Sequence, residues 1–467
     1  MVKQKYTDSY PNTIFGEIPD NVIKGIKNGK KSFAYPIHVQ IDLTNNCNFN
    51  CVGCWCHSEL MEELKFSPKI KKQRLSKKIV FELIDDLAEN GTKEIQLSGS
   101  GEPTTYPYFM DVVRKIKKKG MVLHIVTNFS LITNKIINEL IKLKVDRMTI
   151  SLWAGSAKTY VKTHPNQTEK TFEKIKKNLK YLNKKKKELP TTKIYNVISN
   201  LNYHEIEKMI DLAYVTRSDF IEFQTLDAVK GKTEKLLLNK KQKLSILDKF
   251  KEVELNIKYT PFYFDPINKN TDFVIFYEDS LPKGFKLSKF NEKVKCKKGF
   301  FSNKYNYRNK KNFEFEFNMA ISFCTDCEYK TNCYGNEPFK PKPFRIRFLR
   351  LLGYGEFYRK LSNEKYLEGT YESNIVDKIP CTIGWTYARI LPKGDVIPCC
   401  KAHKKPLGNI NENMFGEIWN STKYNEFREK AKTLKKSNSY FKKINCYKSC
   451  DNLGMNIEIN NVMIIND

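Results

Sequence analysis

The chain alternates short apolar runs with longer amphipathic segments between residue 37 and about residue 227. Amphipathic segments such as IVFELIDDLAENG (79–91) carry apolar residues at helical spacing, and Gly91 and Gly120 lie where two of the helices should end. The apolar runs have the length of strands. Six strands are therefore expected: HVQIDL (38–43), EIQLS (94–98), LHIVT (123–127), MTISLW (148–153), IYNVIS (194–199) and FIEFQTL (220–226).

Six β-then-α units in succession predict a parallel sheet with helical crossovers. Because there are six units rather than eight, we expect an α/β fold built on a partial, TIM-like (β/α)6 barrel. Ligands of parallel β/α folds bind at the carboxyl ends of the strands. The polar motifs that follow the strands are therefore the candidates for a functional site.

The alternation stops near residue 260, and the remainder of the chain differs in composition. It is first rich in Lys, Asn, Phe and Tyr, then contains the proline-punctuated stretch EPFKPKPF, and ends in a compact segment with five cysteines. The expected parts are an N-terminal extension (1–36), the barrel (37–260), a cysteine-containing insertion (261–340), a basic and aromatic linker (341–375) and a cysteine-rich α+β domain (376–467).

The composition indicates a folded protein without a membrane span. No stretch reaches the roughly 18 to 20 apolar residues of a spanning helix, and the first 15 residues lack the apolar core of a signal peptide, so we expect a cytoplasmic protein. The net charge of +30 comes from 82 Lys and Arg against 52 Asp and Glu. These basic residues are spread along the chain, as on solvated helix faces; the run Lys184–Lys187, for example, is predicted to be a frayed helix end.

A polyanionic partner is the alternative explanation of the charge, although we do not expect nucleic acid. The segment 342–361 (KPFRIRFLRLLGYGEFYRKL) alternates arginines with aromatic and aliphatic residues. Such a segment can lie on an anionic membrane surface or contact an RNA backbone, or it can be an ordinary linker helix. Peripheral membrane contact through 342–361 therefore stays open.

Thirteen cysteines are many for a cytoplasmic protein, where clustered cysteines usually serve metal binding or catalysis. Cys47, Cys51 and Cys54 follow the first strand with the spacing C-x3-C-x2-C. Three thiolates on one loop can hold three irons of a cubane cluster and leave the fourth iron open for chemistry. A zinc site with Cys56 or His57 as fourth ligand is the alternative.

Polar residues follow the later strands in a matching order: Ser100, Gly101 and Glu102 after the second strand, Asn128 after the third, Ser151 in the fourth and Asn200 after the fifth. Together with the cysteine loop, this order resembles the radical S-adenosylmethionine superfamily over about 190 residues. Two departures are Gly53, where the family usually has an aromatic residue, and Ser100 in place of the first glycine of a Gly-Gly-Glu motif.

The resemblance implies that Cys47, Cys51 and Cys54 hold a catalytic 4Fe–4S cluster whose open iron binds S-adenosylmethionine. Reductive cleavage of this cofactor would give methionine and a 5′-deoxyadenosyl radical that takes hydrogen from a substrate. The polar residues after the strands would bind the cofactor, Glu102 through the methionyl amino group, although such residues often only cap helices. A donor such as flavodoxin or ferredoxin would supply the electron.

The C-terminal cysteines form a second group. Cys381, Gly394 and Cys399 have the spacing C-x12-G-x4-C, in which the glycine allows a tight turn between two strands. With Cys446 and Cys450 they resemble the SPASM or twitch extension, which implies an auxiliary 4Fe–4S cluster. Cys400 could replace Cys399, and zinc could replace iron. A third group could hold a further cluster, zinc or no metal: Cys296, Cys324, Cys327 and Cys333.

The expected function is that of a radical S-adenosylmethionine oxidoreductase. Only about 36 residues precede the first strand, too few for the leader-binding domain that peptide-modifying relatives often carry. We therefore expect oxidation or epimerisation of a carbohydrate or sugar conjugate, with crosslinking, epimerisation or oxidation of a peptide as the alternative. A non-catalytic iron–sulfur electron carrier or binding protein is the alternative from another class.

Overall fold

The computed structural model describes residues 18–258, 351–352, 361, 364–368, 373 and 375–465, apart from 445, 447 and 448. The predicted insertion at 261–340, with Cys296, Cys324, Cys327 and Cys333, lies outside the described residues.

The described strands are β1 (His38–Asp42), β2 (Glu94–Ser98), β3 (Val122–Thr127), β4 (Arg147–Ser151), β5 (Thr191–Ile198), β6 (Phe220–Thr225), β7 (Leu351–Leu352), β8 (Tyr387–Ile390), β9 (Asp395–Ile397) and β10 (Gly408–Asn409). The described α-helices are α1 (Asp20–Asn28), α2 (Pro68–Lys71), α3 (Lys77–Glu89), α4 (Phe109–Lys118), α5 (Asn134–Lys142), α6 (Ala157–Thr163), α7 (Glu169–Lys185), α8 (Ile206–Val215), α9 (Lys240–Lys258), α13 (Glu364–Leu367), α14 (Ile383–Thr386), α15 (Phe415–Trp419), α16 (Thr422–Thr433), α17 (Ser439–Lys442) and α18 (Leu453–Ile465). The short 3-10 helices are η1 (Glu59–Leu64), η2 (Pro103–Thr105), η3 (Tyr203–Glu205), η4 (Glu234–Leu236) and η7 (Ala402–Lys404).

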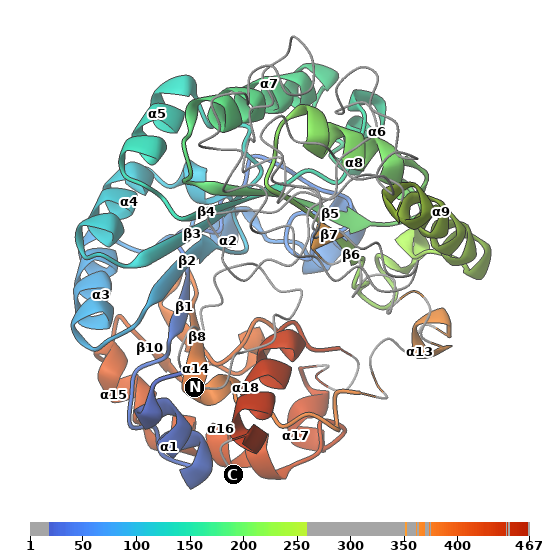
Figure 1. Cartoon of the computed structure of the whole chain (residues 1–467). Coiled ribbons are helices and arrows are strands. Elements are labelled where there is room, and N and C mark those ends of the chain that lie inside the picture. The colour runs from blue at the N-terminus through green and yellow to red at the C-terminus, as the bar shows by residue number, and fades with distance from the viewer. Residues whose placement is uncertain are drawn as a thin grey trace, which may run out of the picture.

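One sheet of ten strands runs through the molecule, in the order β10-β9-β8-β1-β2-β3-β4-β5-β6-β7. Strands β1 to β6 are parallel neighbours in chain order, and the helices α3, α4, α5, α7, α8 and α9 form an arc outside them (Figure 1). This arrangement confirms the predicted partial (β/α)6 barrel.

Local sequence signals account for most of the barrel's elements. On β3, Leu123 and Ile125 belong to the hydrophobic core, whereas Val126 lines an interior cavity, as the alternation of a strand requires. Ser76 begins α3 by accepting a hydrogen bond from the Ile79 N–H. Gly91, with φ of +86°, follows the end of α3, as predicted.

The fourth strand ends two residues earlier than predicted. β4 stops at Ser151, because Trp153 has φ of +57° and turns the chain out of the extended conformation. The remaining barrel strands begin and end within three residues of their predicted bounds.

The C-terminal part continues the barrel's sheet. β8 pairs in parallel with β1, and β8 and β9 form an antiparallel hairpin with Gly394, at φ of +94°, in its turn. The tight turn predicted at Gly394 is therefore confirmed. The predicted barrel and the predicted C-terminal domain thus share one sheet.

The N-terminal helix α1 packs against this C-terminal part. Val22 and Ile26 of α1 form a small apolar cluster with Trp385 of α14, and the Trp385 indole donates to the Lys31 carbonyl at 3.0 Å. In Figure 1, α1 lies beside α14 and α16, two helices that are far from α1 in the sequence. The two ends of the described chain are therefore joined by packing.

The basic and aromatic segment at 342–361 is described only in part. Leu351 and Leu352 form β7, which pairs in parallel with β6 at the sheet edge, and Leu361 is buried. The middle of this segment is therefore a strand, and Arg345, Arg347 and Arg350 lie outside the described residues. Within the described part of the chain, every helix is too short or too polar to cross a membrane.

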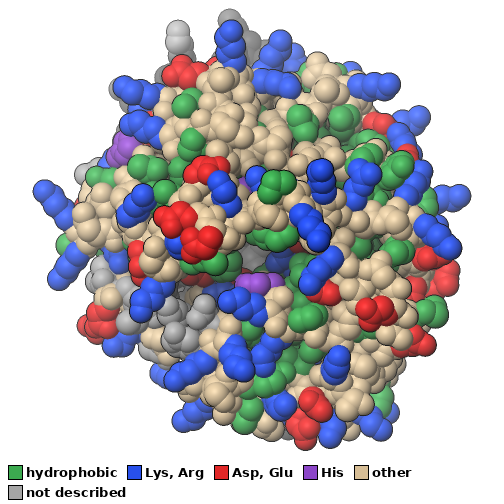
Figure 2. All heavy atoms as spheres, turned by 180° about the vertical axis from the view of Figure 1, so that it is seen from behind, with side chains coloured by type: hydrophobic (Ala, Val, Ile, Leu, Met, Phe, Trp, Pro, Cys, Tyr) green, Lys and Arg blue, Asp and Glu red, His purple; other side chains and the backbone are tan. Residues whose placement is uncertain are grey.

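The face seen in Figure 2 carries Lys and Arg side chains over its whole extent, with acidic side chains between them. This distribution matches the expectation that the basic residues are spread over solvated surface.

Candidate functional site

The cysteine loop follows β1 and lies at the carboxyl end of the sheet. Its backbone folds around the sulfur atoms: the Phe49 N–H donates to the Cys47 sulfur at 3.4 Å, and the Cys56 N–H donates to the Cys54 sulfur at 3.4 Å. Cys47, Cys51 and Cys54 all line a cavity of about 680 Å³. The structure therefore brings the three predicted cluster ligands together.

The electrostatics of the loop fit a metal cluster. Burial raises the pKa of Cys47 to about 12. Burial also raises the pKa of Cys51, and the negative charge of Cys54 raises it further. A hydrogen bond from Cys56, followed by backbone N–H donors, lowers the pKa of Cys54 to about 7. Buried thiols that repel one another as thiolates are stabilised when a metal deprotonates and ligates them.

The turn after β2 is packed closely onto the cysteine loop. The Glu102 N–H donates to the Asn46 carbonyl at 2.8 Å, and a Cβ on Gly101 would collide with the backbone oxygens of Thr44 and Asn46. The His57 imidazole bonds the Ser100 carbonyl at 2.8 Å, which directs this ring nitrogen toward the turn. Only glycine fits at position 101 without moving the loop.

Glu102 is buried and joins the ends of two strands. Its carboxylate accepts hydrogen bonds from the Thr127 hydroxyl at 2.6 Å, the Asn128 N–H at 2.7 Å and the Thr104 N–H at 3.1 Å. Burial raises the pKa of Glu102, while these donors oppose the rise. Glu102 thus begins η2 as a cap, and it also lines the cavity beside the cysteines.

Four more of the predicted cofactor residues line the same cavity, and one does not. The residues at the cavity are Ser100, Gly101, Asn128 and Ser151. Asn200 is not among the lining residues, since its side-chain amide donates to the Lys235 carbonyl at 2.7 Å. Asn200 therefore holds the loop after β6 in this structure.

Several cavity residues were not singled out from the sequence. They are Trp153, Tyr195, Glu222, Gln224, Asp227 and Tyr366. Strand alternation could have found Tyr195 on β5 and Glu222 and Gln224 on β6, because alternate residues of a barrel strand face the interior. No local signal marks Tyr366, which enters the cavity from α13, far along the chain.

The C-terminal cysteines gather in the same way. Burial raises the pKa of Cys399, and the charges of Cys400, Cys381, Cys446 and Cys450 raise it further. The Cys400 sulfur lies 3.4 Å from the Tyr387 hydroxyl. Cys399 as the fourth ligand of this group, with Cys400 as the alternative, stays a prediction.

Residues of both predicted domains form one wall of the cavity. The Lys401 ammonium pairs with the Asp227 carboxylate at 3.0 Å, and the Ser449 hydroxyl lies 3.4 Å from the same carboxylate. The Trp55 indole donates to the Asp227 carbonyl at 2.9 Å. Cys450 also lines the cavity, so the second cysteine group borders the space beside the first.

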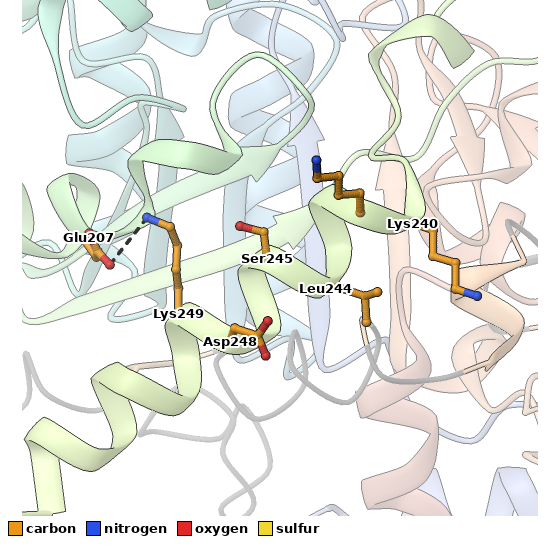
Figure 3. A pocket seen from close by; sticks show the side chains of 7 residues that line it. Glu207, Lys240, Leu244, Ser245, Asp248 and Lys249 are labelled. Atoms are coloured by element: carbon orange, nitrogen blue, oxygen red, sulfur yellow. Dashed lines mark ion pairs between the residues drawn. The ribbon is translucent and has the colours of Figure 1, made fainter.

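A second hollow of about 770 Å³ lies on the outer helices and is lined by residues of α8 and α9 (Figure 3). Lys249 and Glu207 form an ion pair of 3.5 Å across it. Its described lining contains neither a cysteine nor a strand end. We therefore assign the functional site to the cavity at the carboxyl ends of the strands.

Two family models match the chain at these two cysteine groups. The radical SAM superfamily matches residues 41–213, and SPASM, an iron–sulfur cluster-binding domain, matches residues 381–451.

Curated relatives match part of the chain. The tungsten-containing aldehyde ferredoxin oxidoreductase cofactor-modifying protein of Pyrococcus furiosus is 29% identical over 174 residues, 37% of this chain and 46% of that protein. The AdoMet-dependent heme synthase of Methanosarcina barkeri is 28% identical over 174 residues, 37% of this chain and 45% of the synthase. The chain therefore spans less than half the length of these two relatives.

Solved structures match over more of the chain. Streptococcus suis SuiB bound to S-adenosylmethionine has a TM-score of 0.51 at 15% identity, covering 92% of this chain and 75% of SuiB. SuiB bound to the precursor peptide SuiA has a TM-score of 0.52 at 13% identity, covering 92% and 74%. At this identity the likeness concerns the fold.

The two domain matches agree with the two gathered cysteine groups and with the partial barrel between them. The cofactors are accordingly a 4Fe–4S cluster and S-adenosylmethionine in the barrel and auxiliary iron–sulfur cluster chemistry in the C-terminal domain. The chain therefore carries a domain of the radical S-adenosylmethionine superfamily at residues 41–213 and a C-terminal SPASM domain at residues 381–451.

Proposed function

We propose that this radical S-adenosylmethionine enzyme abstracts a hydrogen atom from a carbohydrate or sugar conjugate and oxidises or epimerises it. One observation carries the proposal: a single cavity is lined by Cys47, Cys51 and Cys54 and also by Cys450. A substrate in this cavity would lie between the radical-generating site and the auxiliary site.

Residues of the strand ends would hold the cofactors. Cys47, Cys51 and Cys54 ligate the catalytic cluster, while Cys381, Cys399, Cys446 and Cys450 ligate the auxiliary one. When bound, these groups supply a 5′-deoxyadenosyl radical and an acceptor for one electron. Glu102, Ser100, Asn128 and Ser151 line the part of the cavity next to the first cysteines and would orient S-adenosylmethionine there.

Other residues that line the cavity suit a hydroxyl-rich substrate. Tyr195 and Tyr366 offer ring faces, and Gln224, Asp227 and Glu222 offer groups that accept hydrogen bonds from hydroxyls. Loss of one hydrogen atom, one electron and one proton from an H–C–OH carbon gives a carbonyl, so the oxidation balances with a one-electron acceptor. A flavodoxin or ferredoxin would return the cluster to its reduced state.

A peptide substrate is the second candidate. SuiB, whose fold this chain shares, is described in complex with a precursor peptide. The cavity's carboxylates and rings can accept a peptide side chain as well as a sugar. A non-catalytic iron–sulfur electron carrier or binding protein is the candidate from another class of function.

One assay distinguishes the three candidate functions. The anaerobic holoenzyme is mixed with dithionite, S-adenosylmethionine and perdeuterated sugars or peptides, and 5′-deoxyadenosine is analysed by mass spectrometry. Deuterium from a sugar supports the proposal, and deuterium from a peptide supports the second candidate. A holoenzyme with intact clusters that forms no 5′-deoxyadenosine would be a non-catalytic protein.

A further inference from the structure

We propose that Arg389 of the SPASM domain is a positioning residue for S-adenosylmethionine, acting through Asp42 on the turn at 99–101. The inference rests on the proposed role of residues 100–102 in cofactor binding. It means that the auxiliary domain helps to build the cofactor site of the barrel, and does not only carry its own cluster.

Arg389 reaches the barrel because β8 lies directly beside β1. In the parallel pairing of these strands Arg389 is opposite Gln40, two residues before Asp42. The guanidinium binds the Asp42 carboxylate at two points, Nε to Oδ1 at 3.1 Å and Nη2 to Oδ2 at 2.7 Å. The Asp42 side chain is fully buried, so this two-point contact fixes it in one orientation.

The same carboxylate holds the turn after β2. The Ser100 N–H donates to Asp42 Oδ2 at 3.1 Å, and the Gln40 amide donates to Oδ1 at 2.9 Å. Gly99 has φ of +136°, and a Cβ at this position would collide with the Asp42 side chain. The turn therefore binds a carboxylate whose orientation is fixed by Arg389 of the SPASM domain.

The turn is itself part of the cavity wall. Gly99, Ser100, Gly101 and Glu102 all line the cavity beside the first cysteines. A shift of the Ser100 backbone would move Glu102, the residue proposed to hold the methionyl amino group, as well as the His57 contact to the cysteine loop. Small displacements of a positioned group are costly for binding and chemistry.

Removing the guanidinium leaves a buried carboxylate without its counter-charge. The Asp42 side chain would then rotate or draw in water, and Ser100 would lose the oriented acceptor that seats the turn. Supporting contacts of this kind typically change affinity or activity by about 10-fold to 100-fold.

The test compares Arg389→Gln with Arg147→Gln in the cluster-loaded enzyme. Arg147 also bonds a buried carboxylate, that of Glu94, but both residues lie at the amino ends of their strands, away from the cavity. Arg389→Gln should raise the Kd for S-adenosylmethionine about 10-fold to 100-fold and weaken the change that the cofactor causes in the electron paramagnetic resonance spectrum of the first cluster. Arg147→Gln should keep the Kd within about twofold, as expected for a distant site.

Arg389→Gln with the wild-type Kd and spectrum would overturn the inference. If that variant does not accumulate as folded protein, Arg389→Lys decides, because lysine keeps the charge but loses the two-point contact. A raised Kd for Arg389→Lys supports the inference, and an unchanged Kd overturns it. A wild-type holoenzyme that fails to bind S-adenosylmethionine would instead refute the proposed cofactor site.

Discussion

Lys186 and Asp219 form an ion pair whose two side chains are fully buried, at the amino ends of β5 and β6. The Lys186 ammonium also donates to the Pro190 carbonyl at 2.8 Å. The prediction that the lysine run at 184–187 is a solvated helix end is therefore wrong for Lys186. The helix α7 ends at Lys185, and the next side chain turns into the protein.

Replacing Lys186 by Met should lower the free energy of unfolding by about 3–5 kcal/mol, because Asp219 would remain as an uncompensated buried charge. Urea unfolding of the cluster-loaded protein measures the loss. Lys185→Met, at the exposed neighbouring position, should change the free energy of unfolding by less than about 0.5 kcal/mol. A loss below about 1 kcal/mol for Lys186→Met would contradict the role given to the pair.

Glu102→Gln should weaken S-adenosylmethionine binding by about 1.5–3 kcal/mol, the usual worth of a hydrogen bond to a charged group. The protein should stay folded, since glutamine keeps an oxygen for the Thr104 and Thr127 donors. Equilibrium binding checks this. Thr104→Val removes the Thr104 hydroxyl, which donates to the Glu102 carboxylate at 2.7 Å, but keeps the carboxylate charge, and should weaken binding much less. An unchanged affinity in Glu102→Gln would leave Glu102 as a helix cap only.

At the scale of single elements, the sequence located the barrel strands because each is a short apolar run bounded by turn residues and helix caps. Most of the candidate residues line one cavity because strand ends of a parallel sheet meet at one edge. Asn200 shows the limit of this reasoning. It follows β5 as predicted, but its side-chain amide donates to the Lys235 carbonyl and does not line the cavity. Which way a side chain points depends on neighbours that local patterns do not encode.

The extension of the sheet beyond the barrel was also not predictable. The pairing of β1 with β8 joins residues near 40 to residues near 390, and β7 joins the other edge from an equally distant segment. Such contacts follow from tertiary packing, not from propensity. For the same reason Tyr366 was missed as a cavity residue, whereas Asp227 directly follows the predicted strand at 220–226 and could have been found from the sequence.

The turn that carries Gly101 gives a prediction at the same scale. Gly101→Ala should displace the turn from the Thr44 and Asn46 carbonyls and greatly reduce S-adenosylmethionine binding, while circular dichroism stays unchanged. Gly120→Ala is the control, because its φ of +73° makes alanine cost about 1–2 kcal/mol of stability, yet its Cβ would meet no neighbour. Equal affinity in Gly101→Ala and the wild type would show that the turn tolerates movement.

At the scale of the whole molecule, the two cysteine groups should load independently. The triple variant Cys47→Ala, Cys51→Ala, Cys54→Ala should lose 5′-deoxyadenosine formation but keep about four irons in the C-terminal group, and up to about four more if the group at 296–333 also binds a cluster. Iron analysis and electron paramagnetic resonance measure both. The C-terminal iron should disappear when Cys381, Cys399, Cys446 or Cys450 is changed. Zinc without iron in the triple variant would make the C-terminal site structural.

The pairing of β1 with β8 has a consequence for how the protein is made. A ribosome completes β1 among the first residues of the barrel, but its edge partner β8 is synthesised only after residue 386. For most of translation the nascent chain therefore presents an open strand edge and an uncovered apolar face on α1. That edge stays open until β8 emerges, and a product that terminates before β8 should aggregate rather than accumulate as a free barrel.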